Sequence, residues 1–240
     1  MKSNFRWGMT FAGLAFALAS VARAPISVLG FLLPQSVQFQ NVEGSLWNGS
    51  ASAIGIDGTS IQEHVEWRFQ PQSLLSATLR WDVSGRFGDK LSHLSATVHP
   101  DGMELKQLDV FFPLEPLASL YPSLKAVRPG AELHATSSRL RLNSPSQVSL
   151  DVNDLYFPLL AQAGPLGSYR VTFDLNGNEV GAWKVESLTG NLSVVGQGQI
   201  RIQDLKASGR LMLLPRSPIP SLSSLLKQLP QSGDAYLLAF

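Results

Sequence analysis

The sequence contains no cysteine and few charged residues. The lack of cysteine excludes disulfides, thiolate metal sites, a cysteine nucleophile and a lipidated N-terminal cysteine. Charged residues make up 15% of the 240 residues, and the formal net charge is +1. Binding of nucleic acid or acidic substrates usually needs a concentrated basic surface, so this balance gives no reason to expect such partners. Hydrophobic residues make up 44%, which is enough to build a core.

Motifs for catalysis and metal binding are also missing. No HExxH, HxH or acidic triad accompanies the histidines, and His93 and His99 are six residues apart, too far along one strand to chelate one ion. No serine lies in a GxSxG elbow. Residues 196–198, GQG, lack the third glycine and the following helix of a dinucleotide loop, and a β-bulge is the better interpretation. We therefore predict no enzyme activity, no cofactor and no metal site.

The N-terminus carries a membrane-targeting pattern. Lys2 and Arg6 precede sixteen uncharged residues, 7–22, and a second apolar stretch covers 26–33. Basic residues before an apolar run keep the N-terminus in the cytoplasm and direct the remainder across the membrane. Sixteen helical residues span about 24 Å, a little less than the roughly 30 Å of a hydrocarbon core. The run is therefore either a cleaved signal peptide or an uncleaved anchor.

Pro25 favours the anchor. The small-x-small cleavage site would be residues 22–24, ARA, and a proline directly after it would hinder a peptidase that needs an extended bond. Arg23 can snorkel to the far interface, and the following apolar residues extend the span. We expect residues 1–33 to form the cytoplasmic N-terminus and a single transmembrane anchor, and residues 34–240 to form the domain beyond the membrane.

Beyond residue 34 the hydrophobic period changes to two. Val65, Trp67 and Phe69 alternate with Glu66 and Arg68, which is typical of a half-buried antiparallel strand. The same alternation recurs at 79–84, 93–99, 171–175 and 200–203, with turn signals at 100–102, 176–178 and 232–234. Only 71–75, 114–124 and 221–229 have helical patterns. We predict a mainly β domain, an elongated and curved antiparallel sheet with a few short helices.

An internal similarity suggests two related halves. Residues 108–114, LDVFFPL, resemble residues 153–159, NDLYFPL, and each follows a candidate strand. Pro113 and Pro158 would end their strands in the same way. The pattern predicts two similar β-meanders along one sheet, with an internal division near 126–130.

Two further blocks carry a family resemblance. Residues 42–51 read VEGSLWNGSA and residues 67–75 read WRFQPQSLL. In this order, after an N-terminal anchor, they resemble the signature of the type II secretion system protein N (general secretion pathway protein N) family. Weaker similarity continues through 185–192, 196–198 and 222–229. The positions that match the signature are Gly44, Leu46, Trp47, Gly49, Ala51, Trp67, Pro71, Leu74 and Leu75.

The resemblance implies a single-pass inner-membrane protein with a periplasmic β-rich domain. Such a protein is a non-enzymatic accessory to the machine that exports folded proteins across the outer membrane, with other secretion components as its partners. The residues themselves favour a structural role for the motif. Gly44 and Gly49, with Ser45 and Ser50, allow close backbone approach, and Trp47 would fill the space they leave. The alternative is that Trp47 binds a partner.

Two functions from different classes are compatible with these observations. The first is an interaction protein of the secretion apparatus, which uses sheet edges or loops. The second is a module that handles lipids or other hydrophobic molecules and resembles AsmA-like envelope proteins, whose grooves hold acyl chains. They differ in whether the apolar face is closed by packing or open as a groove. We predict closure by the segments 71–75, 114–124 and 221–229 over a face that includes Trp67, Phe69, Leu79, Trp81, Val171, Phe173, Ile200 and Ile202.

Overall fold

A computed structural model describes most of the chain beyond the expected anchor. The described residues are 37–56, 58–119, 127–141, 143–158, 164–177, 179–203, 206–216, 222–223 and 226–240. The expected anchor, residues 1–33, lies outside these ranges. Within them, no helix combines the length and the apolarity needed to cross a membrane.

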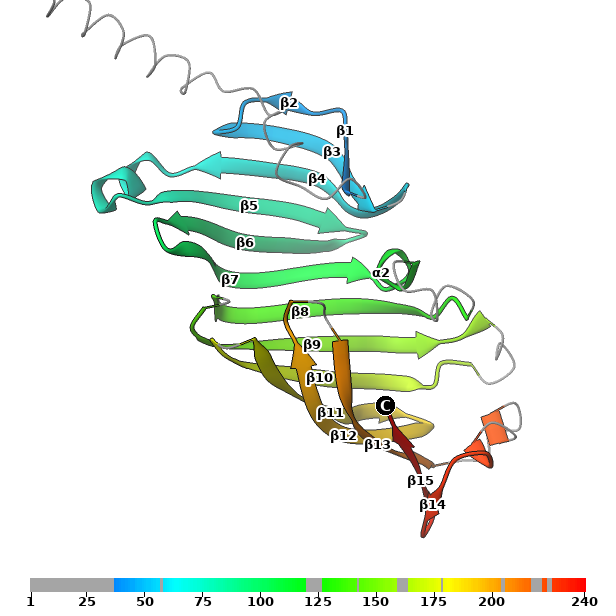
Figure 1. Cartoon of the computed structure of the whole chain (residues 1–240). Coiled ribbons are helices and arrows are strands. Elements are labelled where there is room, and N and C mark those ends of the chain that lie inside the picture. Colours follow the sequence, from blue (N-terminus) through cyan, green and yellow to red (C-terminus); the bar gives the residue numbers. More distant parts are fainter. Residues whose placement is uncertain are drawn as a thin grey trace, which may run out of the picture.

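The described residues form one long, open antiparallel sheet of fifteen strands (Figure 1). The strand order is β1-β3-β4-β5-β6-β7-β8-β9-β10-β11-β12-β13-β15-β14, with β2 also paired to β3. The first eight strands are β1 (Val37–Gln40), β2 (Glu43–Gly44), β3 (Asn48–Ile56), β4 (Thr59–Phe69), β5 (Leu79–Phe87), β6 (Lys90–His99), β7 (Gly102–Pro113) and β8 (Gly130–Leu140). The others are β9 (Pro145–Tyr156), β10 (Gly167–Asn176), β11 (Val180–Gly190), β12 (Leu192–Arg201), β13 (Lys206–Pro215), β14 (Gln231–Ser232) and β15 (Ala235–Ala239).

This architecture confirms the predicted mainly β class and its single long antiparallel sheet. The two segments that resemble each other lie at the ends of β7 and β9, and the strands between them pair in sequence order. Strands β7 and β8, on either side of the expected division near 126–130, pair along most of their length. Two separate meanders with an internal division stay a prediction.

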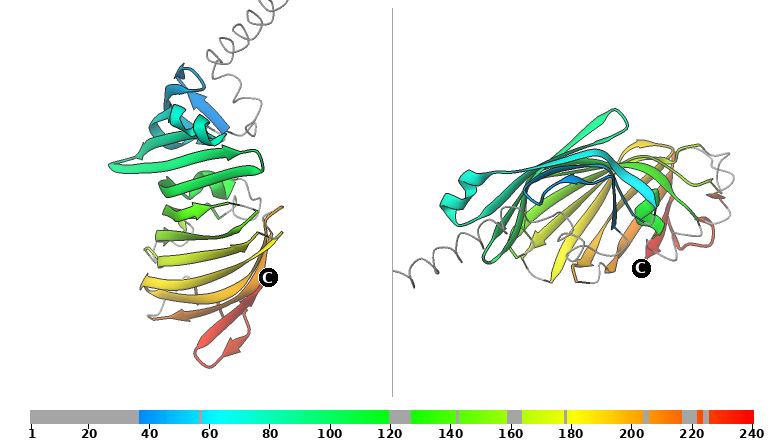
Figure 2. Two further views of the ribbon diagram at one scale, coloured as in Figure 1. Left: turned by 90° about the vertical axis from the view of Figure 1, so that its left-hand side faces the viewer. Right: turned by 90° about the horizontal axis from the view of Figure 1, so that it is seen from above.

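Register shifts interrupt six of the strand pairs, and three of them lie at non-glycine residues with a positive φ angle. His64, Gln107 and Asp154 have positive φ angles of 48°, 51° and 53°. Each lies in or beside a register shift, in the pairs β4–β5, β6–β7 and β8–β9. An extra residue bends its strand and increases the local twist. The sheet is accordingly twisted and curved along its length (Figure 2).

Curvature is strongest in the C-terminal half, where the strands from β10 to β15 curl round (Figures 1 and 2). The hydrophobic core of this half lies on the inside of the curl. Its centre is Tyr169, Trp183 and Val185, packed against partly buried residues that include Val171 and Phe173. A second cluster, centred on Leu166 and Leu192, continues this core toward the end of β13.

The opposite face of the sheet is polar and contains a buried carboxylate. Glu104 of β7 is 1% exposed. It accepts hydrogen bonds from Arg139 of β8 and from His99, whose Nε2 lies 3.2 Å from a carboxylate oxygen, and Lys106 Nζ lies 3.3 Å away. Three cationic or hydrogen-bonding groups thus compensate the burial of one negative charge.

The short helices cover the apolar face only in part. The 3-10 helix η2 (Pro71–Ser76) leaves Leu74 57% and Leu75 92% exposed, so the prediction that this segment closes the face is wrong. Pro71 fixes a turn at the start of η2, and the turn directs the two leucines outward. Helix α2 (Glu115–Ser119) contacts β3 and β4. Leu222 packs on the Leu166–Leu192 cluster, and Leu226 is buried.

Candidate functional site

The two signature blocks meet on neighbouring strands. Gly49 of β3 pairs with Trp67 of β4, and a methyl group at Gly49 would overlap the Trp67 ring. The Trp67 indole Nε1 donates a hydrogen bond of 2.9 Å to the Ser45 carbonyl oxygen, and the side chain is only 8% exposed. Trp67 therefore fills the space above the small residues, and the prediction that Trp47 fills it is wrong. The alternation of β4 already placed Trp67 on the apolar face, but single-strand patterns do not show cross-strand partners.

Trp47 belongs instead to an aromatic cluster beside this contact. Its ring stacks on Trp81 of β5 at a centroid distance of 6.0 Å and meets Phe69 edge-on at 4.7 Å. The indole Nε1 of Trp81 donates to the Leu46 carbonyl oxygen at 3.1 Å. Signature residues thus join the loop before β3 to strands β4 and β5.

The remaining signature positions divide between the interior and the surface. Ala51 is buried in β3. Gly44 has a φ of +93°, and any side chain there would overlap the backbone of Asn48 and Gly49. Pro71, Leu74 and Leu75 lie apart from this group in η2, where both leucines point away from the sheet.

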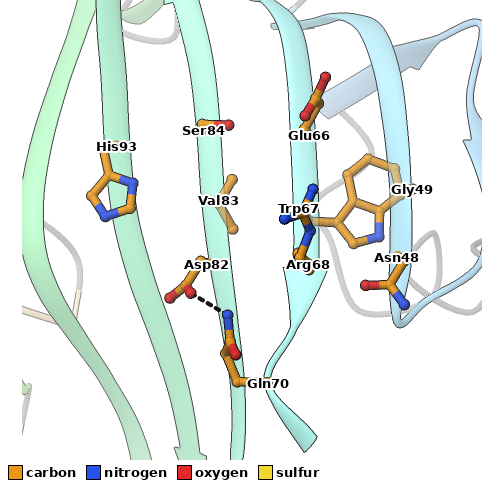
Figure 3. A pocket seen from close by; sticks show the side chains of 10 residues that line it. All are labelled: Asn48, Gly49, Glu66, Trp67, Arg68, Gln70, Asp82, Val83, Ser84 and His93. Carbon is orange, nitrogen blue, oxygen red and sulfur yellow. Dashed lines mark hydrogen bonds between the residues drawn. The ribbon is translucent and has the colours of Figure 1, made fainter.

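A polar hollow of about 320 Å³ lies across β3 to β6 (Figure 3). Glu66 and Arg68 of β4 and His93 of β6 line it, and Asp82 of β5 accepts a hydrogen bond of 2.5 Å from Gln70 Nε2. No group of three or more His, Asp or Glu side chains in the described ranges is arranged to hold a metal ion. The hollow is an open groove lined mainly by polar and charged side chains.

Two of the histidines, His99 and His134, pair with carboxylates. His134 Nε2 lies 2.7 Å from Asp109 Oδ1, and its ring stacks on Phe111 at 3.9 Å. His99 pairs with Glu104, as described above. These contacts stabilise the polar face of the sheet.

A second and larger hollow, here called the apolar trough, lies inside the C-terminal curl. Its volume is about 490 Å³. Only apolar and aromatic side chains line it, and they come from five consecutive strands, the two ends of the β9–β10 connection and the last residue. They are Val152, Leu155, Phe157, Leu166, Tyr169, Val171, Phe173, Trp183, Val185, Leu192, Val194, Ala207, Leu211, Leu213 and Phe240.

The polar atoms of the trough's two large aromatic residues are used by the sheet itself. The Tyr169 hydroxyl donates to the Leu192 carbonyl oxygen at 2.9 Å. Trp183 Nε1 points at the carbonyl oxygens of Gln199 and Ser208, at 3.1 and 3.2 Å. The surface offered inside the trough is therefore hydrocarbon and aromatic.

Glycines on the neighbouring strands make room for Trp183. A methyl group on Gly198 or Gly209 would overlap its ring. The strand pairs around residues 196–198 show no register shift, so the predicted bulge at this GQG segment is wrong. The glycines serve close approach of an aromatic ring, as Gly49 does for Trp67. The sequence signal for this contact was the pair of glycines at alternate positions, 196 and 198, in the strand that follows the one with Trp183.

The described residues thus form an open antiparallel sheet of the all-β class. The family model for type II secretion system (T2SS) protein N matches residues 35–237, and this chain belongs to that family. The sequence resemblance is thereby confirmed. No curated protein and no solved structure matches the chain. Family membership implies involvement in type II secretion and association with its components, and the family is a secretion component and not a known enzyme family.

Proposed function

We propose that this protein is a non-enzymatic accessory component of the type II secretion system. A single N-terminal helix anchors it in the inner membrane, and the β-sheet domain lies in the periplasm. There it assists export of folded proteins across the outer membrane through contacts with other secretion components.

The exposed leucines of η2 carry this proposal. Leu74 and Leu75 match the family signature, yet they are 57% and 92% exposed and contribute nothing to the core. The short helix forms most of the β4–β5 connection and projects from the end of these two strands, where a partner can reach it (Figure 1). Exposed apolar side chains at a projecting turn are typical of protein contacts.

The test is a Leu74→Ser, Leu75→Ser double variant of the full chain. We expect unchanged thermal stability, reduced export of a type II substrate, and loss of in-cell cross-links from η2 to other secretion components. Leu91→Ser is the matched control, because Leu91 is 70% exposed but lies outside the signature. Normal export by the double variant, or an equal loss in the control, would contradict a contact role for η2.

The apolar trough favours a second candidate function, the handling of a hydrophobic molecule. A hollow of about 490 Å³ with an apolar lining falls within the range of about 300–1,000 Å³ that is usual for small-molecule sites. The full chain, purified in a fluorinated surfactant that does not mix with hydrocarbon chains, should release stoichiometric lipid on organic extraction. Recovery of lipid-free protein would contradict this function and leave the secretion contact unaffected.

A further inference from the structure

The shape of the trough limits the kind of molecule that fits. It crosses four strand intervals between β9 and β13, which at about 4.8 Å each makes a path of about 19 Å. One leaflet of a bilayer's hydrocarbon core is about 15 Å thick. An extended acyl chain therefore fits along the trough.

The chemistry of the lining limits the ligand further. An extended peptide or a sugar would bring hydrogen-bonding groups into a surface whose own polar atoms, in Tyr169 and Trp183, already bond to the sheet. Burying such groups without partners is costly. An acyl chain consists of CH₂ groups and therefore gives up no hydrogen bonds when it enters the trough.

One end of the trough carries a positive charge. Arg216 follows β13, and its backbone N–H donates to the Asn191 carbonyl oxygen, next to Leu192 of the lining. Burial raises the pKa of the Tyr169 hydroxyl to about 12, and the charge of Arg216 acts on the same group in the opposite direction. The Arg216 side chain is exposed and forms no ion pair with the described part of the chain.

We propose that the trough binds one acyl chain of an anionic membrane phospholipid, with the lipid phosphate beside Arg216. Charge complementarity at this end sets the orientation, and the hydrocarbon lining that runs from β13 to β9 holds the chain. This inference rests on the second candidate function above and specifies its ligand.

Ala207 and Ser208 provide a matched pair of variants. Ala207 lines the trough, whereas the next residue of the strand points to the opposite face. Ala207→Trp should fill the hollow, and Ser208→Trp adds the same side chain outside it.

Two arginine variants test the role of the charge. Arg216→Gln removes the charge at the trough end, and Arg210→Gln removes a charge from the outer face of β13. Circular dichroism and thermal melting would verify that all four variants are folded.

The experiment is native mass spectrometry of the full chain in fluorinated surfactant. The probes are phosphatidylglycerol and phosphatidylethanolamine with identical acyl chains. We expect a one-to-one lipid complex in wild type and Ser208→Trp, and its loss in Ala207→Trp. Wild type and Arg210→Gln should prefer phosphatidylglycerol about two- to fivefold, the range of an exposed ion pair, and Arg216→Gln should lose this preference.

Different outcomes separate the inference from the candidate function. Absence of any lipid complex, or equal complexes in both tryptophan variants, overturns acyl-chain binding in the trough. A lipid complex without a headgroup preference, or with a preference that survives Arg216→Gln, overturns the assigned orientation but leaves hydrophobe handling standing. Blocked export in Ala207→Trp without lipid binding in wild type would assign the trough to a protein partner instead.

Discussion

Trp67 of β4 lies against Gly49 of β3, so that the two blocks of the family signature meet in one contact across neighbouring strands. The ring, together with the Glu43 carbonyl oxygen, occupies the volume that any side chain at residue 49 would need. The contact explains why a glycine and a tryptophan belong to the same signature although they are eighteen residues apart in the sequence.

Gly49→Ala should therefore destabilise the sheet. Overpacking of this kind costs about 1–3 kcal/mol, which chemical denaturation of the full chain would measure. In a Trp67→Leu background the same substitution should cost less, because the smaller side chain leaves room. Ser50→Ala is the control, since it adds no volume. Additive effects of Gly49→Ala and Trp67→Leu would show that the two residues are not coupled.

Removal of the Trp47 ring should also lower stability. Because Trp47 is only partly buried but stacks on Trp81 and meets Phe69 edge-on, Trp47→Ala should cost roughly 1.5–3 kcal/mol, less than for a fully buried ring. Trp47→Phe should recover part of this loss. If Trp47→Ala melts like wild type yet fails to support export, Trp47 binds a partner.

Glu104 should make stability depend on pH in the acid range. Burial raises the pKa of Glu104, but hydrogen bonds from His99, Lys106 and Arg139 outweigh it and lower the pKa from the usual 4.5 to about 2. A carboxyl with a depressed folded-state pKa stabilises the protein above its unfolded pKa and loses this contribution as the pH falls. The contribution is thus complete above about pH 4.5 and gone near pH 2.

Glu104→Gln tests this dependence. The variant should be less stable than wild type at pH 7 by about 1–3 kcal/mol, and the difference should shrink between pH 4.5 and 2. Denaturant titrations across that range give the two curves, with Glu63→Gln, an exposed carboxylate, as control. A difference that stays constant down to pH 2 would mean that Glu104 acts through packing alone.

The N-terminus should remain on the mature protein. Pro25 directly follows the plausible small-x-small site at 22–24, and proline there should block cleavage. Intact-mass spectrometry of the protein extracted from membranes should therefore find residue 1 or 2 at the N-terminus. A mature chain that begins at or near Pro25 would identify the segment as a signal peptide.

Period-two alternation was sufficient to predict the sheet, because each long strand exposes one face and buries the other. The bulges were not predictable, since His64, Gln107 and Asp154 adopt positive φ without being glycine. The contacts between side chains on different strands could not be predicted from the sequence either. The pairing of Trp67 with Gly49 and the gathering of three groups on Glu104 depend on register, which local composition does not encode. The exposure of Leu74 and Leu75 was not predictable because it depends on the geometry of the single turn that η2 forms.

The order of strands has a consequence for how the chain folds. From β3 to β12 every strand pairs with the strand before it and the strand after it, and β13 and the short strands at both ends pair close by in the sequence. A chain that is made or translocated from its N-terminus can therefore add each strand to the existing edge as soon as it emerges, without waiting for a distant segment. Loop-closure entropy stays small at each step, and we expect the sheet to assemble by progressive zipping.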